Sequence, residues 1–162
     1  HPELGEGSVC PLQIEGGSQT LSVPERATVY ADRHVVIGET RERVIADAEA
    51  TIEALDLESD VEVGIRRAPE PDVVYGPYVT DEDHDLVRAL QGATRDLTGV
   101  DPAIGYCASI GDFNFLGHRA GLPTVIVGAD GGNVHGAGEF VDTEDVIEVA
   151  RIVADAASRL VG

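Results

Sequence analysis

A histidine and a glutamate lie four residues apart on a glycine-rich loop near the C-terminal end of the chain. His135 and Glu139 belong to residues 128–141, which contain five glycines between positions 128 and 138. A neutral histidine is a common ligand of metal ions, and a neighbouring carboxylate can orient it. Glycine lets the backbone approach a bound group closely. These residues indicate a metal or ligand site; the alternative is a solvated turn whose histidine has no function.

The flanking residues predict how this loop is positioned. The apolar run 124–127, bounded by Pro123 and Gly128, predicts a buried strand. Asp142 and Thr143 form a capping signal for a helix that continues to Gly162. The loop therefore lies between the carboxyl end of a strand and a helix, where open α/β sheets bind ligands.

The rest of the second half predicts an α-β-α-β-α segment with parallel strands. We expect helices over 81–98, 113–120 and 143–161, and strands over 104–108 and 124–127. A right-handed crossover would place the loops at 109–112 and 128–139 on the same edge of the sheet. The last helix has an apolar stripe that comprises Val146, Ile147, Ala150, Val153, Ala157 and Leu160.

The first half predicts a β-β-α-β module. Strands are expected over 9–15, 24–35 and 60–66, and a helix follows Thr40 and reaches Leu55. Arg33 falls on the apolar face of the second strand. It either extends out to solvent at the strand end or holds a carboxylate. We place a first domain at 1–68, a proline-rich linker at 69–79 and a second domain at 80–162.

The composition is strongly acidic. The 162 residues include 30 acidic and 11 basic side chains, giving a net charge of −19, and all the basic ones are arginine. This predicts a halophilic protein that stays soluble by self-repulsion, and it disfavours nucleic-acid binding. We expect no membrane span and no signal peptide, and a cytoplasmic location. Cys10 and Cys107 lack metal-site spacing and are expected to be small buried residues.

Four stretches in order resemble the M20 family of zinc aminoacylases and peptidases, which includes acetylornithine deacetylase, succinyl-diaminopimelate desuccinylase and carboxypeptidase G2. The stretches are residues 14–18 with Val23-Pro24, 32–33 with 38–40, 109–113, and the loop of His135 with 139–141. The resemblance implies a ferredoxin-like lid, or dimerisation, domain in the first half and the end of a catalytic domain in the second.

The resemblance also implies roles for individual residues. His135 would be a ligand of one of two zinc ions, with cobalt or manganese as other metals, and Glu139 and Asp112 would support it. Arg33 would hold the carboxylate of an N-acyl amino acid or small peptide, and Gly132 and Asn133 would also contact this substrate. A homodimer is expected through the lid domain or by pairing of an edge strand.

Most of the catalytic residues that the resemblance implies have no counterpart in this sequence. The family's His-x-Asp motif, bridging Asp and Glu-Glu pair are missing, and Leu21 replaces an Asn of the lid hairpin. We therefore expect a C-terminal portion of a family member that is inactive by itself. The remaining histidines, His34, His84 and His118, are expected to be surface residues.

Two other functions remain open at this stage. The chain could be a stand-alone dimerisation or interaction domain without catalysis. It could also be an anion- or nucleotide-binding α/β domain, although the loop lacks G-x-G-x-x-G and Asp130 and Glu139 would repel phosphate.

Overall fold

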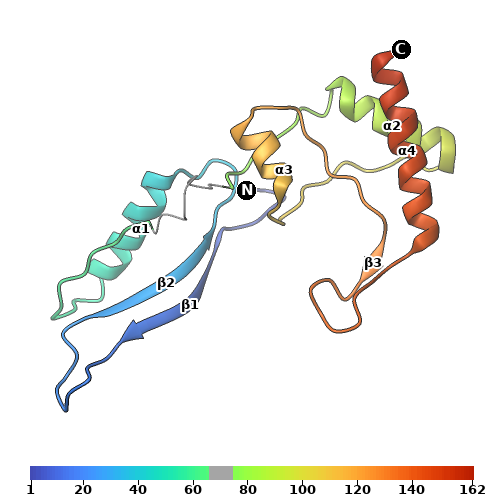
Figure 1. Cartoon of the computed structure of the whole chain (residues 1–162). Coiled ribbons are helices and arrows are strands. Elements are labelled where there is room, and N and C mark those ends of the chain that lie inside the picture. Colours follow the sequence, from blue (N-terminus) through green and yellow to red (C-terminus); the bar gives the residue numbers. More distant parts are fainter. Residues whose placement is uncertain (66–74) are drawn as a thin grey trace. The chain divides into compact units, whose positions relative to one another are not determined.

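The computed structural model describes residues 1–65 and 75–162, which fall into two compact units, His1–Pro77 and Tyr78–Gly162. The first unit combines one helix, and the second several, with a two-stranded antiparallel sheet, so the expected α+β character is confirmed (Figure 1). Most of the predicted linker lies outside the described residues. Within the described residues, no helix is long and apolar enough to span a bilayer.

The first unit is built on a hairpin. Strand β1 (Ser8–Gly16) pairs with β2 (Ala27–His34), with Val9 opposite Arg33 and Gly16 opposite Ala27. The register shifts between Pro11 and Gln13, where proline cannot donate a ladder hydrogen bond. Both predicted strands are confirmed.

Helix α1 (Arg41–Glu53) follows the hairpin as predicted. The Thr40 hydroxyl caps the helix by accepting a hydrogen bond from the Arg43 backbone N–H at 3.2 Å. No side chain of the helix is buried. The start of this helix is therefore determined by the local cap at Thr40 more than by burial of its side chains.

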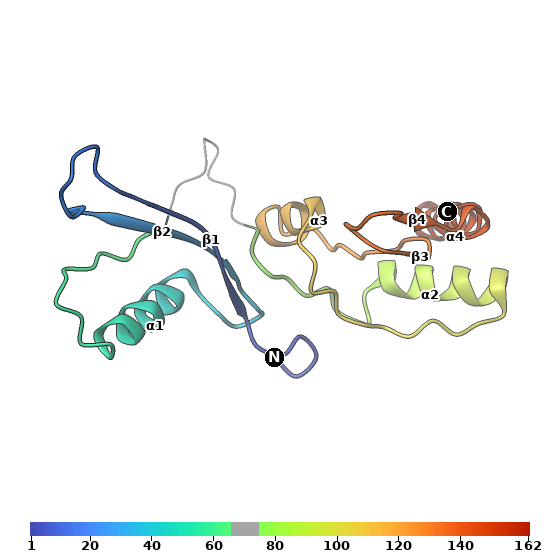
Figure 2. The ribbon, with the colours of Figure 1, turned by 90° about the horizontal axis from the view of Figure 1, so that it is seen from below.

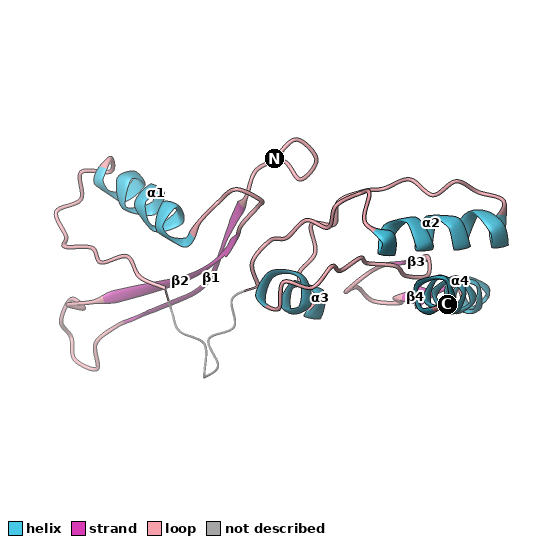
Figure 3. Cartoon of the chain, turned by 90° about the horizontal axis from the view of Figure 1, so that it is seen from above, coloured by secondary structure: helices cyan, strands magenta, loops and turns pink. Residues whose placement is uncertain are grey.

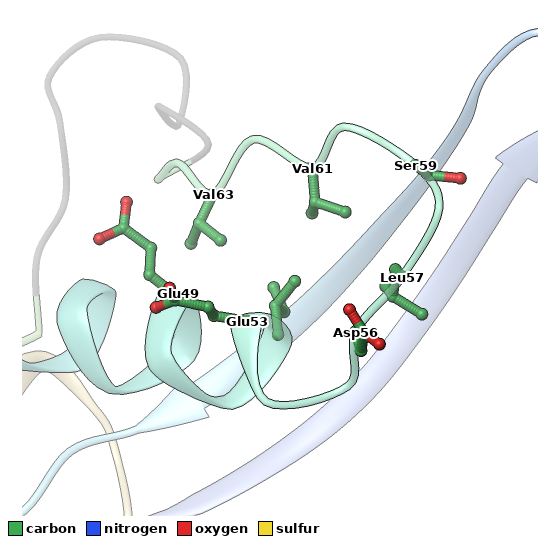
Figure 4. A pocket seen from close by; sticks show the side chains of 8 residues that line it. Glu49, Glu53, Asp56, Leu57, Ser59, Val61 and Val63 are labelled. Atoms are coloured by element: carbon green, nitrogen blue, oxygen red, sulfur yellow. The ribbon is translucent and has the colours of Figure 1, made fainter.

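The third strand predicted for this unit is wrong over its described residues, 60–65, which form no strand. Val61 and Val63 point toward α1 and line an open pocket with Ile52 (Figure 4). A strand is stabilised by a hydrogen-bonded neighbour, and this segment packs beside the helix instead of joining the sheet. The β-β-α-β ferredoxin-like order is thus seen only as β-β-α; Arg66, its predicted end, lies outside the described residues.

The second unit is organised by two packed helices. Helix α2 (Asp85–Thr98) lies beside α4 (Thr143–Val161), as Figure 2 shows. Their shared core consists of Ala89, Ala93, Ile152 and Ala156, with Leu90 packed against it. Small alanine side chains let the two backbones approach closely. Helix α2 ends at Gly99, which takes the left-handed conformation with φ 74°.

The apolar stripe predicted for the last helix, α4, is not the face of the helix that is buried. Ile152 and Ala156 are 5% and 2% exposed, whereas Ile147 and Val153 are 55% and 47% exposed. The helix carries apolar residues on two sides. The alanine-rich face of α2 covers one side, and the strands expected to cover the other do not form.

The parallel strands predicted at 104–108 and 124–127 are also wrong, because both segments are loops (Figure 3). Ile104, Tyr106 and Ile126 are each more than 40% exposed there, so neither segment has the packing that stabilises a buried strand. The strands present instead are β3 (Gly131–Gly132) and β4 (Phe140–Val141), an antiparallel pair. The predicted helix at 113–120 exists as α3 (Asp112–Asn114) continued by a π-helical turn, η1 (Phe115–Arg119).

Candidate functional site: the His135 loop and Arg33

The loop that carries His135 is closed at its base by strand pairing. Gly131 pairs with Val141 and Gly132 with Phe140. The backbone N–H of Asp142 donates to the carbonyl of Asp130 at 3.0 Å and extends this pairing. Residues 133–139 therefore project as a loop from a short hairpin (Figure 1).

Glycine is required at the base because the two strands are very close. A side chain on Gly131 would overlap the carbonyl oxygen of Phe140, and one on Gly132 would meet the Phe140 ring at 2.7 Å. The glycines expected to allow close approach to a ligand thus allow close approach of the chain to itself.

The tip of the loop is held by hydrogen bonds of Asn133. Its backbone carbonyl accepts from the N–H of Gly136 at 2.7 Å, and its side-chain amide donates to the carbonyl of Gly138 at 3.3 Å. Asn133 and His135 both take left-handed backbone angles, with φ of 55° and 59°. Asparagine and histidine are among the non-glycine residues found most often at positive φ, and residues held there occur both in turns and at functional sites. The loop thus presents an exposed histidine on a constrained backbone.

Acidic side chains join the loop to helix α4. The Asp145 carboxylate accepts from the backbone N–H of Asp130 at 3.1 Å, and the Asp130 carboxylate accepts from Gly131 at 2.8 Å. Asp142 caps the helix by accepting from the Glu144 N–H at 2.9 Å, as its sequence signal predicted. The base of the His135 loop therefore carries three carboxylates that accept backbone hydrogen bonds, and this negative charge favours a cation over a phosphate there.

The residues predicted to support His135 form no metal-binding group with it in the described chain. Glu139 is exposed on the same loop, and Asp112 is exposed at the start of α3. Over residues 1–65 and 75–162, no group of three His, Cys, Asp or Glu side chains could hold a metal ion. The donor types suit zinc, but the described residues do not fit a metal centre. The assignment of His135 as a ligand therefore stays a prediction.

Arg33 lies at the end of β2 and holds a carboxylate of its own chain. Its guanidinium donates to the Glu39 carboxylate and to the carbonyl of His34. The backbone N–H of Val36 also donates to Glu39 at 2.8 Å. Hydrogen bonding from Val36 is the main cause that lowers the pKa of Glu39; partial burial opposes it, and Arg33 lowers the pKa further.

Glu39 had no assigned role in the sequence. The sequence feature that could have indicated a role for Glu39 is an acidic residue six positions after Arg33, in the turn that follows β2.

The exposure to solvent predicted for three other histidines and the two cysteines is confirmed only in part. His84 and His118 are exposed as expected, and His84 caps α2 by accepting from Leu86 N–H at 3.1 Å; His34 is half-buried. The expectation of buried cysteines is wrong, since Cys10 and Cys107 are free and exposed. Cys10 lies on a hairpin with no covering layer, and Cys107 lies in a segment that does not join a sheet.

Residues 12–159 match the family model described as peptidase family M20/M25/M40. The chain belongs to this family, as the sequence motifs predicted, and the family generally uses zinc or other divalent metals. No curated protein and no solved structure matched the chain.

Proposed function

We propose that the chain is part of a metal-dependent amidohydrolase that removes the acyl group from an N-acyl amino acid or cleaves a small peptide. The family match over residues 12–159 carries this proposal. In such enzymes the bound metal activates water for attack on the amide carbonyl. Zinc is the proposed metal, with cobalt or manganese as substitutes.

His135 is the proposed contribution of this chain to the metal site. Its support is the closed loop, in which the histidine has a positive φ of 59° and its side chain is exposed. Glu139 and Asp112 are proposed to support it once the site is complete, Gly132 and Asn133 to contact substrate, and Arg33 to hold the substrate's carboxylate.

By itself the chain is proposed to be inactive. The described residues bring together no group of three metal ligands, and hydrolysis also needs a general base. We propose that the remaining ligands and the base come from outside this chain. The acidic composition supports the accompanying proposal of a halophilic, cytoplasmic protein.

A second candidate function is a non-catalytic dimerisation or interaction domain. The observation that favours it is the exposed hairpin, where Leu12 and Ile14 of β1 are 67% and 73% exposed. An edge strand with exposed apolar side chains can pair with a second copy. A homodimer through the first unit is compatible with either function.

Residue-specific metal binding tests the hydrolase proposal. The imidazole resonances of the five histidines can be followed by NMR, and that of His135 is assigned by its absence in His135→Ala. Added Zn²⁺ should shift the His135 resonances before those of the other four, and His118→Ala should leave that response unchanged. Equal weak responses at all five histidines would refute a metal-binding role for the loop and favour the interaction domain.

A further inference from the structure

The carboxylate of Glu39 is bound in the way that proteins bind a carboxylate ligand. One oxygen accepts from the Arg33 guanidinium, and the other accepts from the Val36 backbone N–H at 2.8 Å. Guanidinium groups and backbone amides are the donors that carboxylate sites use. Both side chains are about three-quarters shielded, with 26% and 23% exposed.

The guanidinium is fixed by groups other than Glu39. It donates to the His34 carbonyl, and His34 is paired with Ser8 in the hairpin. Gly7 lies directly against it, since a side chain at that position would overlap the guanidinium nitrogen. Glu39, by contrast, comes from the turn after β2, where its backbone N–H donates to the Val36 carbonyl at 3.1 Å.

We propose that Arg33 and the Val36 N–H form a carboxylate-binding site whose internal occupant is Glu39, which an external carboxylate must displace. This inference rests on the proposed role of Arg33 in holding the substrate's carboxylate. It adds that Glu39 determines specificity by competing for the same donors.

The competition follows from charge and tethering. Glu39 neutralises Arg33, so the occupied site offers an external anion little net attraction. A tethered competitor also acts at an effective concentration of about millimolar or more. Simple carboxylates are therefore excluded, and a substrate that gains contacts elsewhere can still displace Glu39.

Acetate titration of the full 162-residue chain tests the inference. The Arg33 Nε–H resonance is followed by NMR at constant ionic strength in the wild type, Glu39→Gln and Glu39→Ala. Glu42→Gln is the matched control, because it removes the same charge from an exposed position in the first turn of α1. Removing the occupant should raise acetate affinity at least about tenfold, and the control should change it less than about twofold. Adding Arg33→Gln to Glu39→Gln should abolish the response.

The outcomes separate this inference from the proposed function. Equal acetate affinity in the wild type and Glu39→Gln would overturn the inference and leave the role of Arg33 intact. No Arg33 response in either Glu39 variant would overturn both the inference and that role, while the zinc response of His135 is measured independently. Loss of the dispersed hairpin amide signals in both Glu39 variants would make Glu39 a structural element and also overturn the inference.

Discussion

The hydroxyl of Thr80 is hydrogen-bonded to both backbone polar groups of Thr124. It donates to the Thr124 carbonyl at 2.6 Å and accepts from the Thr124 N–H at 3.0 Å, joining segments 44 positions apart.

Thr80→Val keeps the shape and removes both bonds, so it should lower the free energy of unfolding of the second unit by about 1–2 kcal/mol. Urea denaturation measures this, and Thr80→Ser should stay near wild type. A Thr80→Val chain as stable as the wild type would mean that the contact contributes nothing.

The two sides of α4 should respond differently to truncation. Ile152→Ala leaves a cavity between α2 and α4 and should cost about 2–4 kcal/mol of unfolding free energy. Ile147→Ala makes the same change on the exposed side of the same helix and should cost less than about 0.5 kcal/mol. Thermal and urea unfolding of both variants check this. A larger cost at Ile147 would show that the other side of the helix is the packed one.

The lowered pKa of Glu39 makes the first unit sensitive to acid. Hydrogen bonding from Val36, and then from Arg33, favours the charged carboxylate in the folded state. Its contribution to stability is therefore fully present above the pKa of an unfolded glutamate, about 4.3, and is lost as pH falls through the folded pKa.

The stability difference between the wild type and Glu39→Gln should accordingly be larger at pH 6 than at pH 3. Unfolding measured across this range gives the difference, and Glu42→Gln controls for the loss of one charge. Asp47 also acts on Glu39, raising its pKa slightly, so Asp47→Asn should deepen the shift. A difference that is independent of pH would contradict the hydrogen-bonding arrangement at Glu39.

The hairpin below His135 depends on a glycine. Gly131→Ala would place a methyl group against the Phe140 carbonyl and should open the β3–β4 pair at a cost of about 1–3 kcal/mol. Gly128→Ala adds the same methyl group in open space and is the matched control. Limited proteolysis should cut within 133–139 faster in Gly131→Ala alone. Equal cutting of both variants would mean that the strand pair does not hold the loop.

Local signals in the sequence predicted the elements that depend on local chemistry. Thr40 and Asp142 begin helices, Gly99 ends one, and the turn after Gly16 separates two paired strands. Each signal acts within a few residues, so it needs no knowledge of what the element packs against. The family could also be predicted, because its motifs are short and ordered along the chain.

Elements that depend on distant partners could not be predicted in the same way. The apolar runs at 104–108 and 124–127 suit a buried strand, but in the described chain neither run belongs to a sheet. The periodicity of α4 marked apolar residues on two sides and could not choose between Ile147 and Ile152. The partner of Arg33 was missed because a turn, and not a regular spacing, brings Glu39 to it.

We propose that this chain supplies one ligand of a metal-dependent hydrolase site and does not build that site alone. Zinc retained by the purified chain after dialysis in molar KCl tests this claim most directly, measured beside His135→Ala. We expect weak, substoichiometric zinc in the wild type and none in the variant. Two tightly retained zinc ions per chain would contradict it, because the chain would then complete a metal centre unaided.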